Sequence, residues 1–353
     1  MNERKRILFV DDEPALLAAL SNLMRRERHR WDLVFALGGA EALRALEENA
    51  FDVVITDMRM PEIDGLAVLE AVKARSPRTI RIILSGYAES SLVLQALPLV
   101  HQFLSKPCDG KTLRATIERC GAGDRLPNDK TLTGMIGSLP CLPSVPALLD
   151  QLRDATEDPD VTIDALIAIC EQDPALAAKV LQIANTAHFR GDDAPNSSIK
   201  VAVATLGVEV MASLAHSAMV TLPTTTVCQA LIGAFQQDAV EAAHQARRSV
   251  TDPTRADDAY AAGLLHDIGR LVLAHELGDD YLPAIERARL TGAPLWECER
   301  DLLGVTHPAV GAHLLGMWAL PQELVEACER HHDPRALPTR GSMLVTAAQV
   351  AAR

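Results

Sequence analysis

Carboxylate side chains follow two apolar runs near the start of the chain. Asp57 ends the run VVITD (53–57), and Asp11 with Asp12 ends the run in ILFVDDE. If both runs are strands of one sheet, three carboxylates meet at its edge, where they repel one another unless a cation neutralises them. Hard oxygen ligands with open water positions suit Mg²⁺. The pattern therefore predicts a magnesium site at which a phosphoryl group is transferred.

Two further polar side chains follow later apolar runs. Ser85 ends RIILS, and Lys106 precedes a proline after HQFLS. A hydroxyl and an ammonium at the same sheet edge could hold the oxygens of a phosphorylated Asp57. A single aspartate is more often a helix N-cap or a turn residue. The whole series in order favours the phosphoryl-transfer interpretation over that simpler one.

This series resembles the receiver domain of bacterial response regulators, over about residues 4–120. The resemblance implies a flavodoxin-like, five-stranded parallel sheet with strand order 2-1-3-4-5. It implies that a sensor histidine kinase phosphorylates Asp57. It also implies that Asp11 and Asp12 surround the Mg²⁺ ion together with Asp57.

The same resemblance gives roles to three more residues. Ser85 matches the hydroxyl that bonds the phosphoryl group, and Lys106 matches its lysine partner. Phe103 matches the aromatic residue that changes rotamer on activation. With these three residues, the resemblance implies a complete phosphoacceptor site and the switch that responds to it.

The length of the chain predicts a second domain, and its net charge limits what that domain could bind. The chain has 353 residues, which suggests about two domains of the usual size. Its net charge is −13, and no basic face stands out that would neutralise phosphates. A nucleic-acid-binding output domain is therefore disfavoured.

Several features indicate a cytoplasmic protein without a membrane partner. The seven cysteines are scattered and form no CxxC pair, which indicates reduced thiols. Too few apolar residues precede Asp11 for a signal peptide. The apolar run at 201–222 contains Glu209 and His216, so a buried helix of a soluble bundle is favoured over a membrane span.

The hydrophobic period changes along the chain. Within residues 1–120, short apolar runs alternate with helical patterns, which is typical of βα units and a parallel sheet. Clustered Gly, Pro, Asp and Asn residues predict a linker at 121–133. Over 134–353, apolar residues at helical spacing between DP, LP and HP dipeptides predict an all-α domain.

This second part resembles an HDOD domain, an output domain related to HD-type metal-dependent phosphohydrolases. The resemblance covers essentially all of residues 134–353. HDOD domains usually lack part of the metal-ligand set, so the resemblance implies a signalling or scaffolding module and not an enzyme. The segments that carry it include DPALAAKVLQIANTAHF (173–189), AGLLHDIGRLVL (262–273), GAHLLGMWALP (311–321) and the histidine pair at 331 and 332.

Candidate metal ligands of the HD type remain in this part. In an HD enzyme such residues converge on one or two metals that activate water. Gln237 and Gln349 occupy the positions of the first histidine and the last aspartate, and an amide is a weaker ligand. His244 lies too far along its helix to substitute. We therefore expect no metal here, and a hydrogen-bonded interior cluster instead. The remaining candidates are His266, Asp267, His307, His331 and His332.

The favoured interpretation is a phosphorylation-controlled response regulator whose HDOD domain relays the state to a downstream signalling protein without catalysis. One alternative is a receiver-regulated HD phosphohydrolase, for example a cyclic-di-GMP phosphodiesterase. Against it, the chain continues HHDPRALPTRGS from His331, without the Gly-Tyr-Pro of the HD-GYP class. A second alternative is an HDOD domain that binds a nucleotide messenger without hydrolysing it. A homodimer also stays open.

Four single residues receive structural predictions. Asp173, followed by Pro174, is expected to cap a helix that has the proline at its first position. Asn185 either bonds a neighbouring backbone group or faces a partner, and the sequence does not choose. Trp296 and Trp318 are expected to pack against helices.

Overall fold

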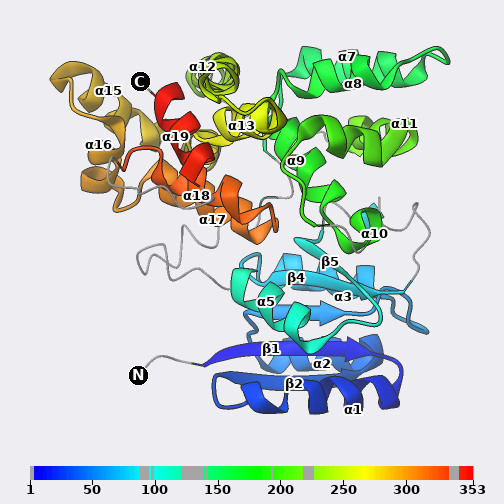
Figure 1. Cartoon of the computed structure of the whole chain (residues 1–353). Coiled ribbons are helices and arrows are strands. Elements are labelled where there is room, and N and C mark those ends of the chain that lie inside the picture. Colours follow the sequence, from blue (N-terminus) through cyan, green and yellow to red (C-terminus); the bar gives the residue numbers. More distant parts are fainter. Residues whose placement is uncertain are drawn as a thin grey trace. The chain divides into compact units, whose positions relative to one another are not determined.

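The protein is described by a computed structural model in which the chain forms two compact units (Figure 1). One unit is built mainly from residues 1–123, and the other from residues 141–185 and 192–353. The structure describes residues 4–86, 95–96, 99–120, 139, 142–191, 194–217, 226–333 and 342–352.

The first unit is a parallel five-stranded sheet with strand order β2-β1-β3-β4-β5. This order and the alternation of strands with helices confirm the fold predicted for this part. Its strands are β1 (Lys5–Asp11), β2 (Trp31–Leu37), β3 (Val53–Thr56), β4 (Ile80–Ser85) and β5 (Gln102–Ser105). Its helices are α1 (Pro14–Leu23), the 3-10 helix η1 (Arg25–Glu27), α2 (Gly38–Glu48), α3 (Gly65–Arg75) and α5 (Gly110–Cys120).

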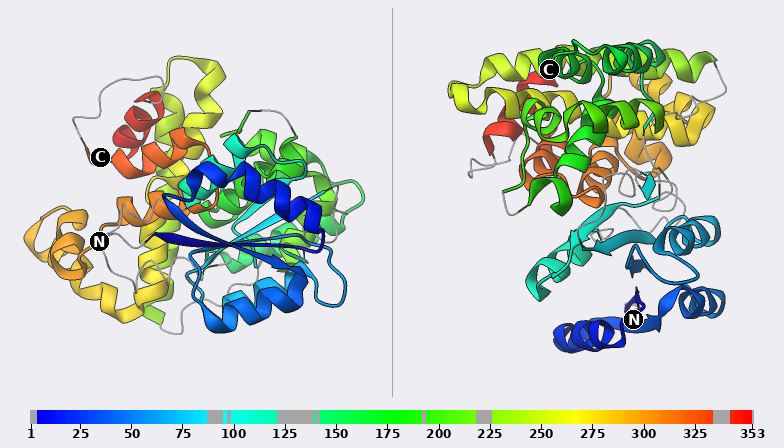
Figure 2. Two further views of the ribbon diagram at one scale, coloured as in Figure 1. Left: turned by 90° about the horizontal axis from the view of Figure 1, so that it is seen from below. Right: turned by 90° about the vertical axis from the view of Figure 1, so that its right-hand side faces the viewer.

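Helices cover both faces of this sheet, as Figure 2 shows for α1 and α2. On one face, Ile7 and Phe9 of β1 pack with Leu17 of α1 and Leu113 of α5 in one buried cluster. Helices α2 and α3 lie against β1 and β3 from the other side. Because the inner strands are buried on both faces, they are continuous apolar runs.

The loop after β3 is fixed closely to helix α3. The backbone N–H of Gly65 donates to the carbonyl oxygen of Met58 at 3.0 Å. The Asp64 side chain caps the helix by accepting the N–H of Ala67 at 2.8 Å. A Cβ atom at Gly65 would overlap the carbonyl oxygen of Asp57, so only glycine lets the helix begin this close to Asp57.

The second unit is helical, and no strand occurs among its described residues, as the sequence predicted. The helix pairs α12 and α13, α14 and α17, and α17 and α18 pack closely. The helices after residue 142 are α7 (Pro146–Glu157), α8 (Ile163–Cys170), α9 (Pro174–Ala184), α10 (Ala187–Arg190), α11 (Ile199–Ser217), α12 (Thr226–Ser249), η3 (Pro253–Arg255), α13 (Ala256–Leu265), α14 (Ile268–Leu277), η4 (Gly278–Tyr281), α15 (Leu282–Thr291), α16 (Leu295–Leu303), α17 (His307–Met317), α18 (Gln322–Arg330) and α19 (Ser342–Ala351).

Helix α9 begins as the sequence predicted. The buried Asp173 carboxylate accepts the N–H groups of Ala175 at 2.8 Å and Leu176 at 3.2 Å, and Pro174 is the first helical residue. The other oxygen of Asp173 accepts the N–H of Val145 at 2.9 Å. The cap therefore also fixes the segment that leads into α7.

The structure decides the open question about Asn185 in favour of a backbone contact. Its Nδ2 donates to the carbonyl oxygens of Leu181 at 2.9 Å and Asn196 at 2.8 Å, and its Oδ1 accepts the N–H of Asn196 at 2.7 Å. The side chain joins the end of α9 to the segment before α11. Trp318 is fully buried and Trp296 is half-buried, as expected of residues that pack against helices.

Helix α11 contains the described part of the apolar run. The segment Ile199–His216 is long and apolar enough to cross a membrane by length and composition alone. However, Gly207 adopts φ 70° and ψ 176°, which breaks the helix within this segment. Helix α11 packs against α7, α8 and α9, as expected of a helix within a bundle.

A glycine contact between α14 and α17 gives a test of this packing. A Cβ atom at Gly269 would overlap the carbonyl oxygen of His307, so Gly269→Ala must push the helices apart. We expect it to lower the free energy of unfolding by about 1–3 kcal/mol. Gly316→Ala, also on α17, meets nothing within 4 Å and should be neutral or stabilising by up to about 1 kcal/mol. Equal denaturant midpoints for the two variants would contradict the close approach.

Candidate functional site

Two carboxylates and an ammonium meet at the carboxyl edge of the parallel sheet. Asp57 follows β3, and its backbone N–H donates to the carbonyl oxygen of Val10 at 2.9 Å. Asp11 ends β1, is 1% exposed and accepts the N–H of Glu13 at 2.9 Å. The Nζ atom of Lys106, which follows β5, lies 2.7 Å from Asp11 Oδ2 and 2.9 Å from Asp57 Oδ1. The ammonium therefore bridges the two carboxylates.

Burial and charge act in opposite directions on these groups. Burial raises the pKa of Asp57 and the nearby Asp11 adds to the rise, while the hydrogen bond from Lys106 opposes it. Burial alone would lower the pKa of Lys106, but its hydrogen bonds to both aspartates carry the pKa above its usual value. Lys106 thus stays charged and offsets one of two negative charges. The oxygen donors that remain at this edge are of the kind Mg²⁺ prefers.

The other residues predicted for this site are placed as follows. Asp12 is half-buried directly after Asp11. Phe103 is buried in β5, with 6% of its surface exposed. Ser85 ends β4 in register with Ser105 of β5, which puts its backbone at the same edge, but its side chain lies outside the described residues.

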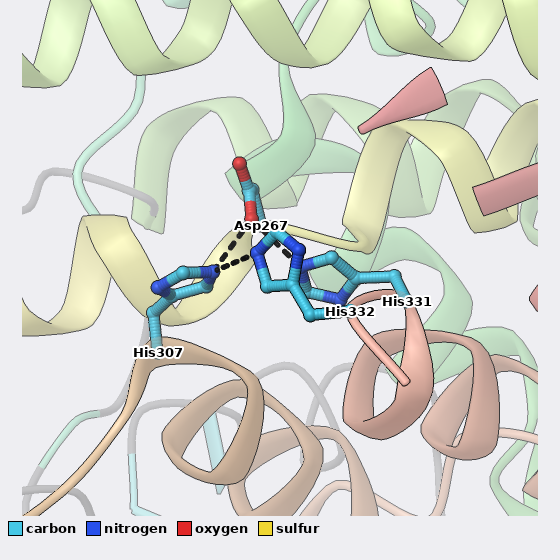
Figure 3. Close-up of side chains that lie close together, drawn as sticks. All are labelled: Asp267, His307, His331 and His332. Atoms are coloured by element: carbon cyan, nitrogen blue, oxygen red, sulfur yellow. Dashed lines mark hydrogen bonds and ion pairs between the residues drawn. The ribbon is translucent and has the colours of Figure 1, made fainter. Parts of the chain in front are cut away.

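A second cluster lies within the helical unit, where three imidazoles surround one carboxylate (Figure 3). Asp267 lies between α13 and α14, His307 begins α17, and His331 and His332 follow α18. One donor atom from each lies within 4.8 Å of all the others. Asp267 Oδ1 is 3.1 Å from His307 Nε2 and 3.2 Å from His331 Nε2. The Nε2 atoms of His307 and His332 are 3.2 Å apart.

Two of these histidines are held through their other ring nitrogen. Nδ1 of His307 lies 2.8 Å from Oε2 of the fully buried Glu299, whose other oxygen accepts the hydroxyl of Tyr281. Nδ1 of His331 lies 2.7 Å from the carbonyl oxygen of Cys328. These contacts fix both rings so that each Nε2 faces the centre of the cluster.

The second oxygen of Asp267 has different neighbours. Nη1 of Arg270 lies 2.8 Å from Asp267 Oδ2, and its guanidinium stacks over the Phe235 ring with 4.2 Å to the ring centroid. The Nε2 atom of His266 is 3.5 Å from the same oxygen, and its Nδ1 lies 2.7 Å from the carbonyl oxygen of Gly263. Oδ2 of Asp267 therefore faces a guanidinium and the His266 imidazole, and Oδ1 faces the imidazoles of His307 and His331.

The protonation of the cluster follows from burial and charge. Burial lowers the pKa of His266 to about 4 and that of His332 to about 3. Burial alone would also lower the pKa of His307, but Asp267 and Glu299 outweigh it and raise the pKa to about 9. Burial alone would raise the pKa of Asp267, yet His266 and His307 hold it well below its usual range. Near neutral pH, His266 and His332 are thus uncharged beside an ionised Asp267.

The two glutamines assigned to former ligand positions have different surroundings. Gln237 is exposed on α12, where it lines an open pocket together with His244. Gln349 on α19 donates its amide to the carbonyl oxygens of Arg330 and Asp333. It thereby holds the turn that carries the histidine pair. The sequence analysis gave no role to Glu299 or Tyr281: Glu299 lies eight residues before His307, and Tyr281 supports Glu299 from 18 residues away.

Comparison with known families agrees with this geometry. Residues 142–334 match the HDOD domain family, and residues 7–118 match the response regulator receiver domain family. This chain is a response regulator with an HDOD domain. Both family assignments made from the sequence are thereby confirmed, as is the order of the two domains.

This HDOD response regulator is similar to several known proteins. It is 32% identical over 143 residues to the transcriptional regulatory protein ZraR of Escherichia coli O157:H7, which covers 38% of this chain and 32% of ZraR. The chain thus spans about a third of the length of the curated relatives it matches.

Two solved structures are also similar. The MmoQ response regulator from Methylococcus capsulatus is 27% identical with a TM-score of 0.48, covering 60% of this chain and 86% of that one. A virulence factor of Campylobacter jejuni, cj0248, is 18% identical with a TM-score of 0.55, covering 64% and 83%. The likeness to cj0248 is one of fold alone.

Proposed function

We propose that Asp57 accepts a phosphoryl group from a sensor histidine kinase and that the HDOD domain relays this state to a downstream protein in the cytoplasm. The observation that carries the proposal is the contact of Lys106 with both Asp57 and Asp11, at 2.9 Å and 2.7 Å. It places the Asp57 carboxylate at a sheet edge beside a cation. We assign reception to residues 1–120, linkage to 121–133 and output to 134–353.

In the transfer step, a carboxylate oxygen of Asp57 attacks phosphorus. The new P–O bond forms as the P–N bond to the kinase histidine breaks, and the electron pair of that bond stays on the imidazole, which takes up a proton. Asp11, Asp12 and Asp57 would hold Mg²⁺, which when bound neutralises charge on the phosphoryl oxygens. Lys106 supplies a further positive charge next to Asp57.

The proposed switch begins with a change in the partners of the Lys106 ammonium. A phosphoryl group on Asp57 adds negative charge and acceptor oxygens, which compete with Asp11 for the ammonium. We propose that Lys106 and Ser85 then hold the phosphoryl oxygens, and that Phe103 changes rotamer beside them. Because Phe103 lies in β5, the change would alter the receiver surface at that strand.

We propose that the HDOD domain has no hydrolytic activity. Two features support this. Arg270 holds one oxygen of Asp267, so that oxygen is not free to bridge a second metal. Gln237 is exposed and Gln349 is engaged with backbone carbonyls, so neither supplies the missing ligands. The His/Asp cluster itself favours the second candidate, a receiver-regulated phosphohydrolase, and an assay separates the two.

The first prediction concerns the acceptor. Full-length protein with Mg²⁺ should incorporate phosphate from radiolabelled acetyl phosphate, and Asp57→Asn should abolish the label because an amide does not form the acyl phosphate. Asp32→Asn serves as the control, since Asp32 is exposed on β2 and pairs with Arg6. Equal labelling of Asp57→Asn and Asp32→Asn would refute the assignment.

The second prediction concerns the switch. Lys106→Ala should still be phosphorylated, but the label should no longer change hydrogen exchange at the amides of β4 and β5. The reason is that the methyl group cannot bond the phosphoryl oxygens. Lys111→Ala is the matched control, because Lys111 is exposed at the start of α5. A full phosphorylation response in Lys106→Ala would show that the state is passed on by another route.

The third prediction concerns hydrolysis. We expect wild-type protein, with and without phosphorylation, to leave cyclic di-GMP and a generic phosphodiester uncleaved in the presence of Mn²⁺, Fe²⁺ or Zn²⁺. The matched comparison is Asp267→Asn, which removes the charge at the centre of the cluster. Turnover by the wild-type protein that disappears in Asp267→Asn would make the phosphohydrolase the correct interpretation.

A further inference from the structure

The four side chains Asp267, His307, His331 and His332 have the spacing of ligands around a single ion. Three of the six separations between their donor atoms are 3.1, 3.2 and 3.2 Å, and all six are within 4.8 Å. Two ligands that each lie 2.0–2.1 Å from a tetrahedral metal stand about 3.3 Å apart. The spacing therefore agrees with donors that share one metal.

The orientation of the donors points the same way. Among the described residues, neither Asp267 Oδ1 nor Nε2 of the buried His331 has a hydrogen-bond partner. They approach to 3.2 Å without the alignment that a hydrogen bond requires. Buried polar atoms normally have a partner. Atoms that crowd together without bonding one another are satisfied when both face the same cation.

Hydrogen bonds at Nδ1 orient the imidazole rings of His307 and His331 for metal binding. Glu299 takes the Nδ1 side of His307, and Tyr281 in turn donates to Glu299. The carbonyl oxygen of Cys328 takes the Nδ1 side of His331. Metal-binding histidines almost always have such a partner on the second nitrogen, which leaves the first with a free electron pair.

We propose that Asp267, His307, His331 and His332 bind one first-row transition-metal dication, and that the guanidinium of Arg270 stands where a second cation would otherwise bind Asp267. Arg270 lies 2.8 Å from Asp267 Oδ2 and is held over the Phe235 ring. The guanidinium charge therefore compensates Asp267 Oδ2 in place of a second metal ion. The domain would then hold one metal and lack the metal pair that a shared Asp267 would bridge.

The donor set also selects the class of metal. Three imidazoles and one carboxylate suit zinc, iron, cobalt or nickel, whereas Mg²⁺ prefers oxygen ligands. The ion in the helical domain is therefore distinct in chemistry from the Mg²⁺ at the receiver site. Because the ligands come from the α13–α14 junction, the start of α17 and the end of α18, the ion would fasten three parts of the domain together.

The test is a titration of untagged, chelator-stripped full-length protein with Zn²⁺ and Co²⁺ in excess Mg²⁺, which occupies the receiver site. We expect one equivalent per chain and, for Co²⁺, the intense visible absorption of a low-coordinate site. His332→Ala should weaken Zn²⁺ binding at least about 100-fold, and Glu299→Gln about 10–100-fold. His216→Ala is the control, because His216 is exposed on α11 and bonds only within its helix.

Arg270→Gln distinguishes a fixed cation from an ordinary packing residue. Removing a positive charge beside the site should tighten Zn²⁺ binding, by about tenfold or more, because like charges repel. A residue that acts only through packing would weaken binding when replaced.

Three results would overturn the proposal. The first is that wild-type protein binds no Zn²⁺ or Co²⁺. The second is that the affinity for Zn²⁺ is unchanged in His332→Ala. The third is that two equivalents of metal still bind per chain in Asp57→Asn. Weaker binding in Arg270→Gln would refute the role of the guanidinium alone. Since His332 is partly exposed, its replacement keeps the test usable if variants of the buried histidines do not fold.

Discussion

A carboxylate that leaves water needs hydrogen-bond donors or a positive charge close by, and both candidate sites of this protein supply a positive charge. At the end of the sheet, Asp11 and Asp57 would repel each other, and Lys106 contacts both. The hydrogen bond from Lys106 opposes the rise that burial causes in the pKa of Asp57. Under the proposed phosphorylation of Asp57, the new negative group would compete with Asp11 for the ammonium.

The helical domain meets the same requirement with several partners. Asp267 has Arg270 at one oxygen and imidazoles at the other, and the balance of these charges holds its pKa far below the usual range. Around this centre, Gly269 lets α14 lie directly against the backbone of α17. The charge cluster and the close packing therefore occupy the same helix junction, and neither can shift without the other.

The sequence predicted the receiver well because its chemistry lies at element ends. The apolar runs before Asp11 and Asp57 locate strand ends, and in a parallel sheet all carboxyl ends share one edge. The all-α second domain and the cap at Asp173 were predicted for similar local reasons, whereas the strand order was implied by the resemblance to receiver domains. The contact between Lys106 and Asp11 needed the structure, because no pattern fixes which of two anions an ammonium prefers.

The helical site was harder to predict, because helix phase is ambiguous where a helix is apolar almost all round. Gln237 was placed at a ligand position, yet a rotation of α12 leaves it exposed beside His244. Arg270 lies three residues after Asp267, so a helical spacing could have suggested the pair. Glu299 and Tyr281 join His307 only through tertiary packing, which the local pattern does not contain.

The members of the cluster depend on one another for their stability. Removing one member of a buried charged group leaves its partners uncompensated, which costs more than the group as a whole contributes. Without Asp267, Arg270 would keep a buried charge and His307 would lose the anion that raises its pKa. Without Glu299, both His307 and the buried Tyr281 would lose a partner. Most of the cluster is therefore needed to keep α14, α17 and α18 in place.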